Sequence, residues 1–254
     1  MRASASIKYT YLILNDILSN DLISENRGGL LVITLARAQK ANALTLALTR
    51  DLGQLLRGAQ ADGAVHGVLI TGSGERAFCA GVDVREASDL PEPEFRRARS
   101  QAFFGLLLAL SDFEKPLVAA VNGAASGGGF MIAALADVIV AVESAHFALP
   151  EIDLGSPPLA ALVILEPWLG GALAYDLVQT ARKLDAAEAE RRGLVRAVLP
   201  RAALFAQAET LARELIAKNP RAFAASKAWL RKPVRRELER AEAAMVAWRA
   251  AGGE

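Results

Sequence analysis

The chain contains few of the residues that form disulfides and transition-metal sites. Its 254 residues include one cysteine, Cys79, and two histidines, His66 and His146. A single cysteine excludes an internal disulfide and is typical of a reducing compartment, so we predict a cytoplasmic protein. The cysteine and histidines lack the spacing of zinc ligands, which predicts no metal site. We interpret Cys79 as a small packed residue.

An excess of either charge is absent as well. Lys and Arg number 29 and Asp and Glu number 28, for a net charge of +1. The basic bias that supports binding to nucleic acid or to anionic membranes is therefore missing, and we expect neither partner. Apolar residues make up 53% of the chain, which is enough for a large core and excludes general disorder.

One uncharged stretch, Pro116 to Ala136, is long enough to cross a bilayer. Four glycines, Asn122 and Ser126 interrupt its middle, however. We interpret the stretch as a strand, a loop and a buried helix, and predict no membrane span.

Hydrophobic patterning divides the chain into three regions. Residues 1–26 are polar and irregular and predict an N-terminal arm. From 27 to 199, short apolar runs alternate with helical patterns, which predicts an α/β core of parallel strands with right-handed crossovers. Residues 200–254 predict an all-helical, mixed-charge region. The expected strands are 30–35, 67–71, 117–121, 137–142 and 194–198, and the expected helices are 45–60, 92–110, 128–135, 159–168, 170–180, 186–192, 202–217, 220–230 and 233–249.

Two glycine-bearing loops follow neighbouring apolar runs. Residues 78–83 read Phe-Cys-Ala-Gly-Val-Asp, and residues 122–129 read Asn-Gly-Ala-Ala-Ser-Gly-Gly-Gly. Loops at the ends of neighbouring strands can direct two backbone N–H groups at one point, where they stabilise negative charge on a carbonyl oxygen. Glycine permits such close backbone approach, although tight packing of a helix on a strand would also require it. With Glu151 downstream, the pattern indicates chemistry beside a carbonyl.

These two loops resemble those of the crotonase superfamily, the enoyl-CoA hydratase/isomerase family. Further matching blocks lie at 41–44, 115–121, 136–141 and 147–152, in the family's order. The resemblance implies an α/β fold of stacked β-β-α turns, with a C-terminal helical region used in trimerisation. It also implies an acyl-CoA thioester as substrate, no further cofactor, and a homotrimer or dimer of trimers. The oxyanion hole maps to the backbone N–H groups of Val82 and Gly128.

The resemblance also places Glu151 against the acyl chain, where a carboxylate can act as general acid and base. The alternative is a surface carboxylate, as most glutamates are. Burial among apolar groups would raise the pKa of Glu151 towards the working pH. Asp83 is expected to fix the first loop rather than to react.

The chain departs from the family pattern at Met131. Hydratases of the family usually carry a second glutamate there, and methionine can neither hold a water molecule nor transfer a proton. One carboxylate suffices to move a proton between Cα and Cγ, so we predict isomerisation. Hydration is the alternative, with Asp153 or a bound water compensating, because Asp153 on a strand would share a face with Glu151. A non-catalytic acyl-CoA binder is a further alternative. Leu159 stands where some relatives carry a catalytic aspartate, which argues against dienoyl isomerase and dehalogenase activity.

Recognition of the CoA portion is assigned from the resemblance. The family places the nucleotide near the first strand, which points to Arg37, Lys40 and Ala43, together with Ala80 in the first glycine loop. Lys227 matches a basic family position on a C-terminal helix. For the charged members of this set, a solvated surface position is the alternative interpretation.

Overall fold

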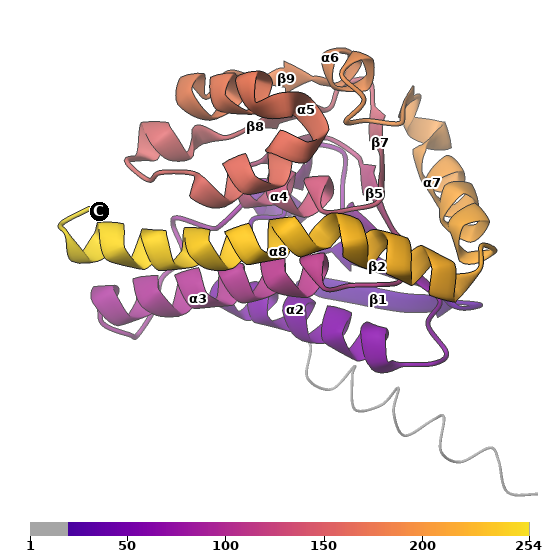
Figure 1. Ribbon diagram of the computed structural model, residues 1–254, viewed down its shortest axis with the longest axis horizontal. Coiled ribbons are helices and arrows are strands. Elements are labelled where there is room, and N and C mark those ends of the chain that lie inside the picture. Colours follow the sequence, from indigo (N-terminus) through magenta and orange to yellow (C-terminus); the bar gives the residue numbers. More distant parts are fainter. Residues whose placement is uncertain (1–19, 254) are drawn as a thin grey trace, which may run out of the picture.

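The computed structural model describes residues 20–253, in which the strands form two sheets (Figure 1). In the larger sheet, β1 pairs antiparallel with β2, and all other neighbours are parallel. The central strands β3 and β5 are buried along their whole length, which is why they read as continuous apolar runs. The order across this sheet is β1 (Leu22–Arg27), β2 (Leu30–Leu35), β3 (Gly67–Gly72), β5 (Leu117–Val121), β7 (Val138–Val142) and β10 (Ala197–Leu199).

The smaller sheet consists of very short strands. Each of β3, β5 and β7 is followed by one strand of this sheet and then by a helix, so three β-β-α turns stack on one another. This arrangement confirms the α/β fold of stacked turns. Patterning alone did not indicate the short strands, because three residues are too few to show alternation. The strands are β4 (Ala77–Cys79), β6 (Ala124–Ser126), β8 (His146–Ala148) and β9 (Leu184–Asp185), and the following helices are α3 (Glu92–Ser111), α4 (Gly128–Ala134) and the 3-10 helix η2 (Pro150–Leu154).

The longest helix, α8 (Pro220–Ala250), runs beside α3 across one face of the molecule and also contacts α5 (Leu159–Thr180) (Figure 1). It begins after Asn219, whose side chain accepts a hydrogen bond from the N–H of Ala222. The sequence predicted two helices separated near Pro233, but α8 is continuous there, with Lys227 and Val234 buried on either side. The remaining helices are η1 (Ala38–Lys40), α2 (Leu46–Ala61), α6 (Ala186–Arg191) and α7 (Arg201–Ile216).

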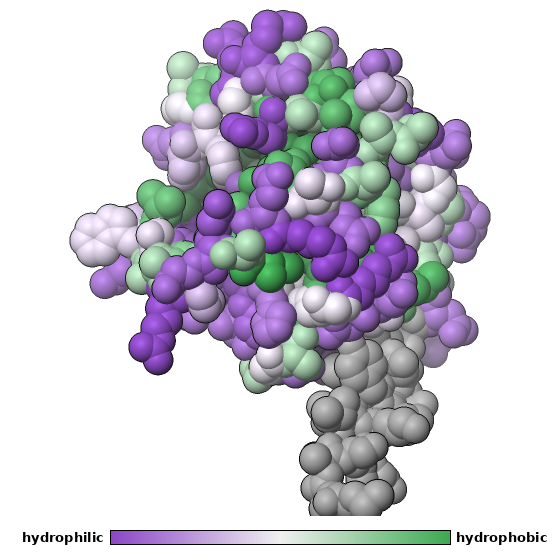
Figure 2. All heavy atoms as spheres, turned by 90° about the vertical axis from the view of Figure 1, so that its right-hand side faces the viewer, coloured by the Kyte–Doolittle hydropathy of each residue, from purple (hydrophilic) through white to green (hydrophobic). Residues whose placement is uncertain are grey.

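The stretch 116–136 contains β5, β6 and α4, as interpreted from its glycines. Between residues 20 and 253, α5 is the one helix long and apolar enough to cross a membrane by length and composition. It is not a continuous rod, because Gly170 has non-helical dihedrals (φ 73°, ψ 155°). Figure 2 shows a face that carries mostly hydrophilic residues with hydrophobic residues between them.

The N-terminal boundary differs from the prediction. The expected arm, 1–26, overlaps β1, so the sheet begins at Leu22 rather than after residue 26. β1 is an edge strand whose two exposed positions are Ile23 and Glu25 and whose other residues are mostly polar, a composition that indicates no strand in the sequence. Residues 1–19 lie outside the described part of the chain.

Candidate active site

The first glycine loop is held against the segment that precedes α2. The N–H of Leu44 donates to the Gly81 carbonyl (2.8 Å), and the N–H of Asp83 donates to the Leu44 carbonyl (2.9 Å). Between these two bonds, the N–H of Val82 has no partner among residues 20–253. The loop is therefore fixed while one donor stays free.

The second loop supplies another free donor. Gly127 has a positive φ (52°) and donates its N–H to the Ala148 carbonyl (2.8 Å). Gly128 then begins α4, so its N–H has no intrahelical acceptor and lies at the positive end of the helix. A Cβ on Gly81 would lie only 3.0 Å from the Gly128 nitrogen. The two loops thus meet, and the N–H groups of Val82 and Gly128 belong to adjoining segments.

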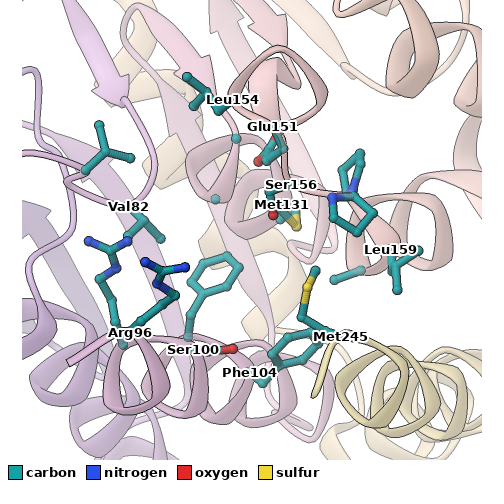
Figure 3. A pocket seen from close by; sticks show the side chains of 18 of the residues that line it. Val82, Arg96, Ser100, Phe104, Met131, Glu151, Leu154, Ser156, Leu159 and Met245 are labelled. Carbon is teal, nitrogen blue, oxygen red and sulfur yellow. The ribbon is translucent and has the colours of Figure 1, made fainter. Parts of the chain in front are cut away.

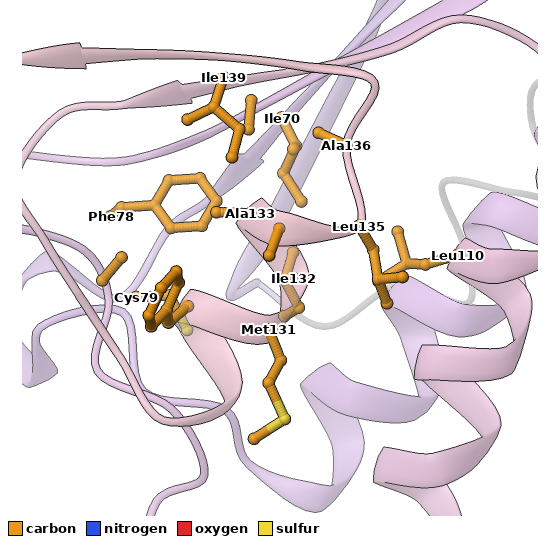
Figure 4. Packing of buried hydrophobic residues seen from close by; sticks show 14 of the residues in the cluster. Ile70, Phe78, Cys79, Leu110, Met131, Ile132, Ala133, Leu135, Ala136 and Ile139 are labelled. Carbon is orange, nitrogen blue, oxygen red and sulfur yellow. The ribbon is translucent and has the colours of Figure 1, made fainter. Parts of the chain in front are cut away.

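Behind the second loop, α4 is buried at all of its residues. The rings of Phe130 and Phe147 pack with their centroids 5.0 Å apart. Met131 points away from the cluster around Ile70 and Ile139 (Figure 4) and borders the cavity described next. Core packing therefore fixes the start of α4, and with it the Gly128 N–H.

A cavity of about 380 Å³ lies beside the two loops and is bordered by Val82, Gly128 and Glu151 together. The structure therefore brings the three predicted catalytic residues to one place. Figure 3 shows Glu151 and Met131 on one side of this space and Phe104 on α3 opposite. Much of the wall is apolar, and the side chains that form it include Phe103, Phe104, Met131, Leu154, Leu159 and Met245.

The Glu151 carboxyl group is buried in this wall and carries an unused oxygen. Its Oε2 is shielded from solvent and has no hydrogen-bond partner within residues 20–253. Burial raises the pKa of Glu151 to about 7, partly opposed by its own backbone N–H. A Cβ on Gly127 would lie 2.7 Å from Oε1, so only glycine lets the carboxyl group approach here. A carboxyl group with this pKa can both accept and return a proton near neutral pH.

This geometry of paired free N–H groups beside a buried carboxyl agrees with the comparison to known proteins. A family model described as enoyl-CoA hydratase/isomerase matches residues 25–248. The chain belongs to the enoyl-CoA hydratase/isomerase family. Members of this family act on acyl-CoA esters, and this chain is an acyl-CoA enzyme of the same kind.

Individual relatives agree with this assignment. A carnitinyl-CoA dehydratase from Citrobacter koseri is 38% identical over 213 residues, which are 83% of this chain and 80% of the relative. The enoyl-CoA hydratase of Bacillus anthracis superposes with a TM-score of 0.76 at 28% identity, covering 87% of this chain and 90% of that one. An enoyl-CoA hydratase/isomerase from Mycobacterium paratuberculosis gives a TM-score of 0.82 at 26% identity, covering 90% and 93%.

Within residues 20–253, no second carboxylate is buried beside the cavity of this family member. Met131 occupies its expected position and is only 4% exposed. Glu92 also borders the cavity, but its exposed side chain pairs with Arg96 at 3.1 Å. The prediction that Asp153 shares a strand face with Glu151 is wrong. Both lie in the 3-10 helix η2, where residues two apart point in different directions, and Asp153 is exposed to solvent.

The predicted CoA-binding residues near the first strand take separate roles. Arg37 is largely buried, and its Nη1 pairs with Asp83 Oδ2 at 3.1 Å and donates to the Ala43 carbonyl. Arg37 and Asp83 therefore fix the first loop, as expected for Asp83. Lys40 is exposed on η1, and Ala80 borders the cavity, whereas Arg37, Lys40 and Ala43 do not.

Lys227 does not border this cavity, and its interpretation as a CoA ligand stays a prediction. Its side chain is 5% exposed, and Nζ donates to Asp137 Oδ2 (2.7 Å) and to the Lys115 carbonyl (2.8 Å). Asp137 Oδ2 also accepts the N–H of Leu117 (2.8 Å), so the pair ties α8 to the start of β5. Burial lowers the pKa of Lys227 to about 8, opposed by Asp137. These contacts give Lys227 a structural role in holding α8 against β5.

Sequence reasoning missed the polar residues that border the cavity from two helices. Arg96, Arg99 and Ser100 project from α3, and Arg249 projects from α8. The signal was present, because residues 96, 99, 100 and 103 share one helical face and the last of them abuts Gly128. No signal within the sequence pairs residue 249 with this face, since the contact depends on how α8 packs on α3.

Proposed function

We propose that this enzyme isomerises 3-enoyl-CoA esters to 2-enoyl-CoA esters by moving a proton between Cα and Cγ. The observation that carries the proposal is that Glu151 holds the one buried carboxyl group that residues 20–253 place at the cavity. Glu151 has an unpartnered oxygen and a pKa of about 7, while Met131 fills the position of a second carboxylate. Isomerisation needs one proton carrier and no water, which matches a cavity wall with one buried carboxyl group.

The proposed reaction begins with the thioester oxygen at the N–H groups of Val82 and Gly128. The Glu151 carboxylate removes a proton from Cα, and the electrons of that C–H bond delocalise into the thioester as an enolate. The two N–H groups stabilise the resulting negative charge, and loss of one such donor typically costs about 100- to 1,000-fold in rate. Glu151 then delivers the proton to Cγ, which leaves the double bond between Cα and Cβ.

Water addition or elimination is the second candidate, because the Citrobacter koseri relative is named a carnitinyl-CoA dehydratase. In this reaction Glu151 would exchange the Cα proton, and a further group would have to handle the hydroxyl at Cβ. No second carboxylate within the described chain is buried beside the cavity. We therefore rank this reaction below isomerisation.

Two substrates separate the candidates. Wild-type protein and Glu151→Gln are incubated with 3-hexenoyl-CoA and with crotonyl-CoA, and the absorbance of the conjugated thioester is followed. Isomerisation predicts that absorbance increases with 3-hexenoyl-CoA and that Glu151→Gln abolishes this increase. A decrease in absorbance with crotonyl-CoA, without any increase with 3-hexenoyl-CoA, would establish hydratase activity instead. Silence with both esters, while calorimetry shows that they bind, would indicate a non-catalytic acyl-CoA binder.

We further propose a homotrimer or dimer of trimers in the cytoplasm. Trp229 and Leu230 on α8 are 81% and 73% exposed, and Val246 is 60% exposed, which is unusual for large apolar side chains on a helix. Multi-angle light scattering tests the assembly, and a monomer at micromolar concentration would contradict it.

A further inference from the structure

Three arginines border the same cavity as Glu151. Arg96 is neutralised by Glu92, whose Oε1 lies 3.1 Å from its Nη2. Arg99 and Arg249, in contrast, have no carboxylate within 4.0 Å among residues 20–253. Arg99 donates only a weak bond to the Asp83 carbonyl (3.3 Å) and stacks on Phe95. Burial raises the pKa of Glu86, and the charge of Arg99, acting at longer range, partly opposes this rise. Two guanidinium groups without a direct ion pair therefore border one partly buried space.

Arg249 is the less satisfied of the two. Its Nη1 donates to Ser100 Oγ (2.7 Å), but its Nε is shielded from solvent and has no hydrogen-bond partner in the described chain. Burial, together with the charges of Arg96 and Arg99, lowers its pKa. A shielded donor and a crowd of like charges are both unfavourable unless an anion is bound. The planar fork of a guanidinium group matches a carboxylate in shape and charge.

The positions of Arg96 and Arg99 along α3 indicate how far they lie from the oxyanion hole. The Phe103 ring abuts Gly128, because a Cβ on Gly128 would lie 2.7 Å from it. With a rise of 1.5 Å per residue, the Cα of Arg99 lies about 6 Å further along the helix axis and that of Arg96 about 10 Å. A short acyl chain whose thioester occupies the oxyanion hole covers such a distance. The nearby apolar wall gives its methylene groups a suitable environment.

We propose that the acyl group of the substrate ends in a carboxylate, which Arg99 and Arg249 bind. The preferred substrates are then short dicarboxylic enoyl-CoA esters, and this inference rests on the proposed function of the same site. An acyl group that ends in a quaternary ammonium is rejected by the same charges. The other source of a matching anion is a phosphate of CoA itself, and the experiment below separates the two.

Calorimetry with unreactive saturated esters gives the test. Glutaryl-CoA is compared with pentanoyl-CoA, adipyl-CoA with hexanoyl-CoA, and each with free CoA. We expect the ester with the terminal carboxylate to bind about 10- to 100-fold more tightly than its neutral partner, as for hydrogen bonds to charged groups. Arg249→Gln and Arg99→Gln are expected to abolish this advantage, and Arg249→Lys to retain part of it. Affinity for free CoA and for the neutral esters is expected to fall much less than affinity for the dicarboxylic esters.

The control is Arg236→Gln, which alters an exposed arginine elsewhere on α8 and is expected to change nothing. Equal binding of dicarboxylic and neutral esters by the wild type would overturn the proposal. Equal weakening of all ligands in the Arg249 and Arg99 variants, free CoA included, would also overturn it, by assigning the arginines to a CoA phosphate. Thermal unfolding of each variant detects misfolding. If Arg249→Gln does not fold, the binding preference of Arg249→Lys for the terminal carboxylate is the test instead.

Because these esters do not react, the result is independent of turnover. An enzyme that isomerises 3-hexenoyl-CoA but shows no preference for a terminal carboxylate contradicts this inference alone. A protein with that preference but no turnover contradicts the proposed function alone.

Discussion

Replacing Glu151 by glutamine is expected to remove catalysis and to remove a loss of fold stability that the wild type undergoes as the pH rises. Burial raises the pKa of Glu151 from 4.5 to about 7 in the native protein. The folded state therefore binds a proton more tightly than the unfolded state does. This contribution to stability is fully present below pH 4.5 and is lost as the pH rises through about 7.

The size of the effect follows from the shift in pKa. A shift of about 2.5 units, at about 1.4 kcal/mol per unit, corresponds to about 3 kcal/mol. Glutamine does not titrate, so any effect of its amide on the free energy of unfolding is the same at both pH values. The stability of the wild type relative to Glu151→Gln should therefore fall by about 3 kcal/mol between pH 4.5 and pH 8.5.

Urea unfolding at the two pH values measures this difference. Protein concentration is held constant, because assembly shifts apparent stability by mass action. Glu214→Gln, at an exposed position on α7, controls for general effects of removing a carboxylate. A wild-type-to-variant difference that stays constant within about 0.5 kcal/mol would refute the argument that burial alone prepares Glu151 for proton transfer.

Three further changes have definite expected outcomes. Met131→Glu should introduce water addition to crotonyl-CoA, because it restores a second carboxylate, and a rate no higher than that of the wild type would contradict this. Gly128→Ala places a Cβ 2.7 Å from the Phe103 ring and should lower kcat by about 100-fold through displacement of the N–H donor, whereas unchanged kcat would place the oxyanion elsewhere. Lys227→Met leaves Asp137 buried without its partner and should reduce stability by about 3–5 kcal/mol in urea unfolding. It should leave KM for CoA esters unchanged, with Lys232→Met as the exposed control, and a rise in KM at unchanged stability would support Lys227 as a CoA ligand.

The sequence predicted the parts of the fold that are set by long buried runs. β2 and β5 lie where continuous apolar stretches indicated strands, because a strand buried on both faces has no room for polar residues. The short strands β4 and β6 were interpreted as loops, since their pairing comes from the stacking of turns rather than from their own three residues. The edge strand β1 was missed because it lies at the border of the sheet, where polar residues are tolerated and no continuous apolar run forms.

Some residues of the candidate site could also be predicted from the sequence, and others could not. Val82, Gly128 and Glu151 were assigned through the family resemblance of the two glycine loops and the Pro-Glu turn, and the structure places all three beside one cavity. The structural role of Lys227 could not be predicted, because whether a lysine is free or buried against Asp137 depends on contacts between residues 90 positions apart. Arg249 meets Ser100 across 149 positions, so its place at the cavity follows only from the packing of α8 on α3.

The central claim is that Glu151 exchanges the proton on Cα while the two N–H groups hold the enolate, and proton exchange tests it most directly. Butyryl-CoA, which can neither isomerise nor add water, is incubated with the enzyme in deuterium oxide, and the Cα signal is followed by proton NMR. The account predicts loss of this signal with the wild type and its persistence with Glu151→Gln. Equal exchange in both proteins, or no exchange with a wild type that binds the ester, would contradict it.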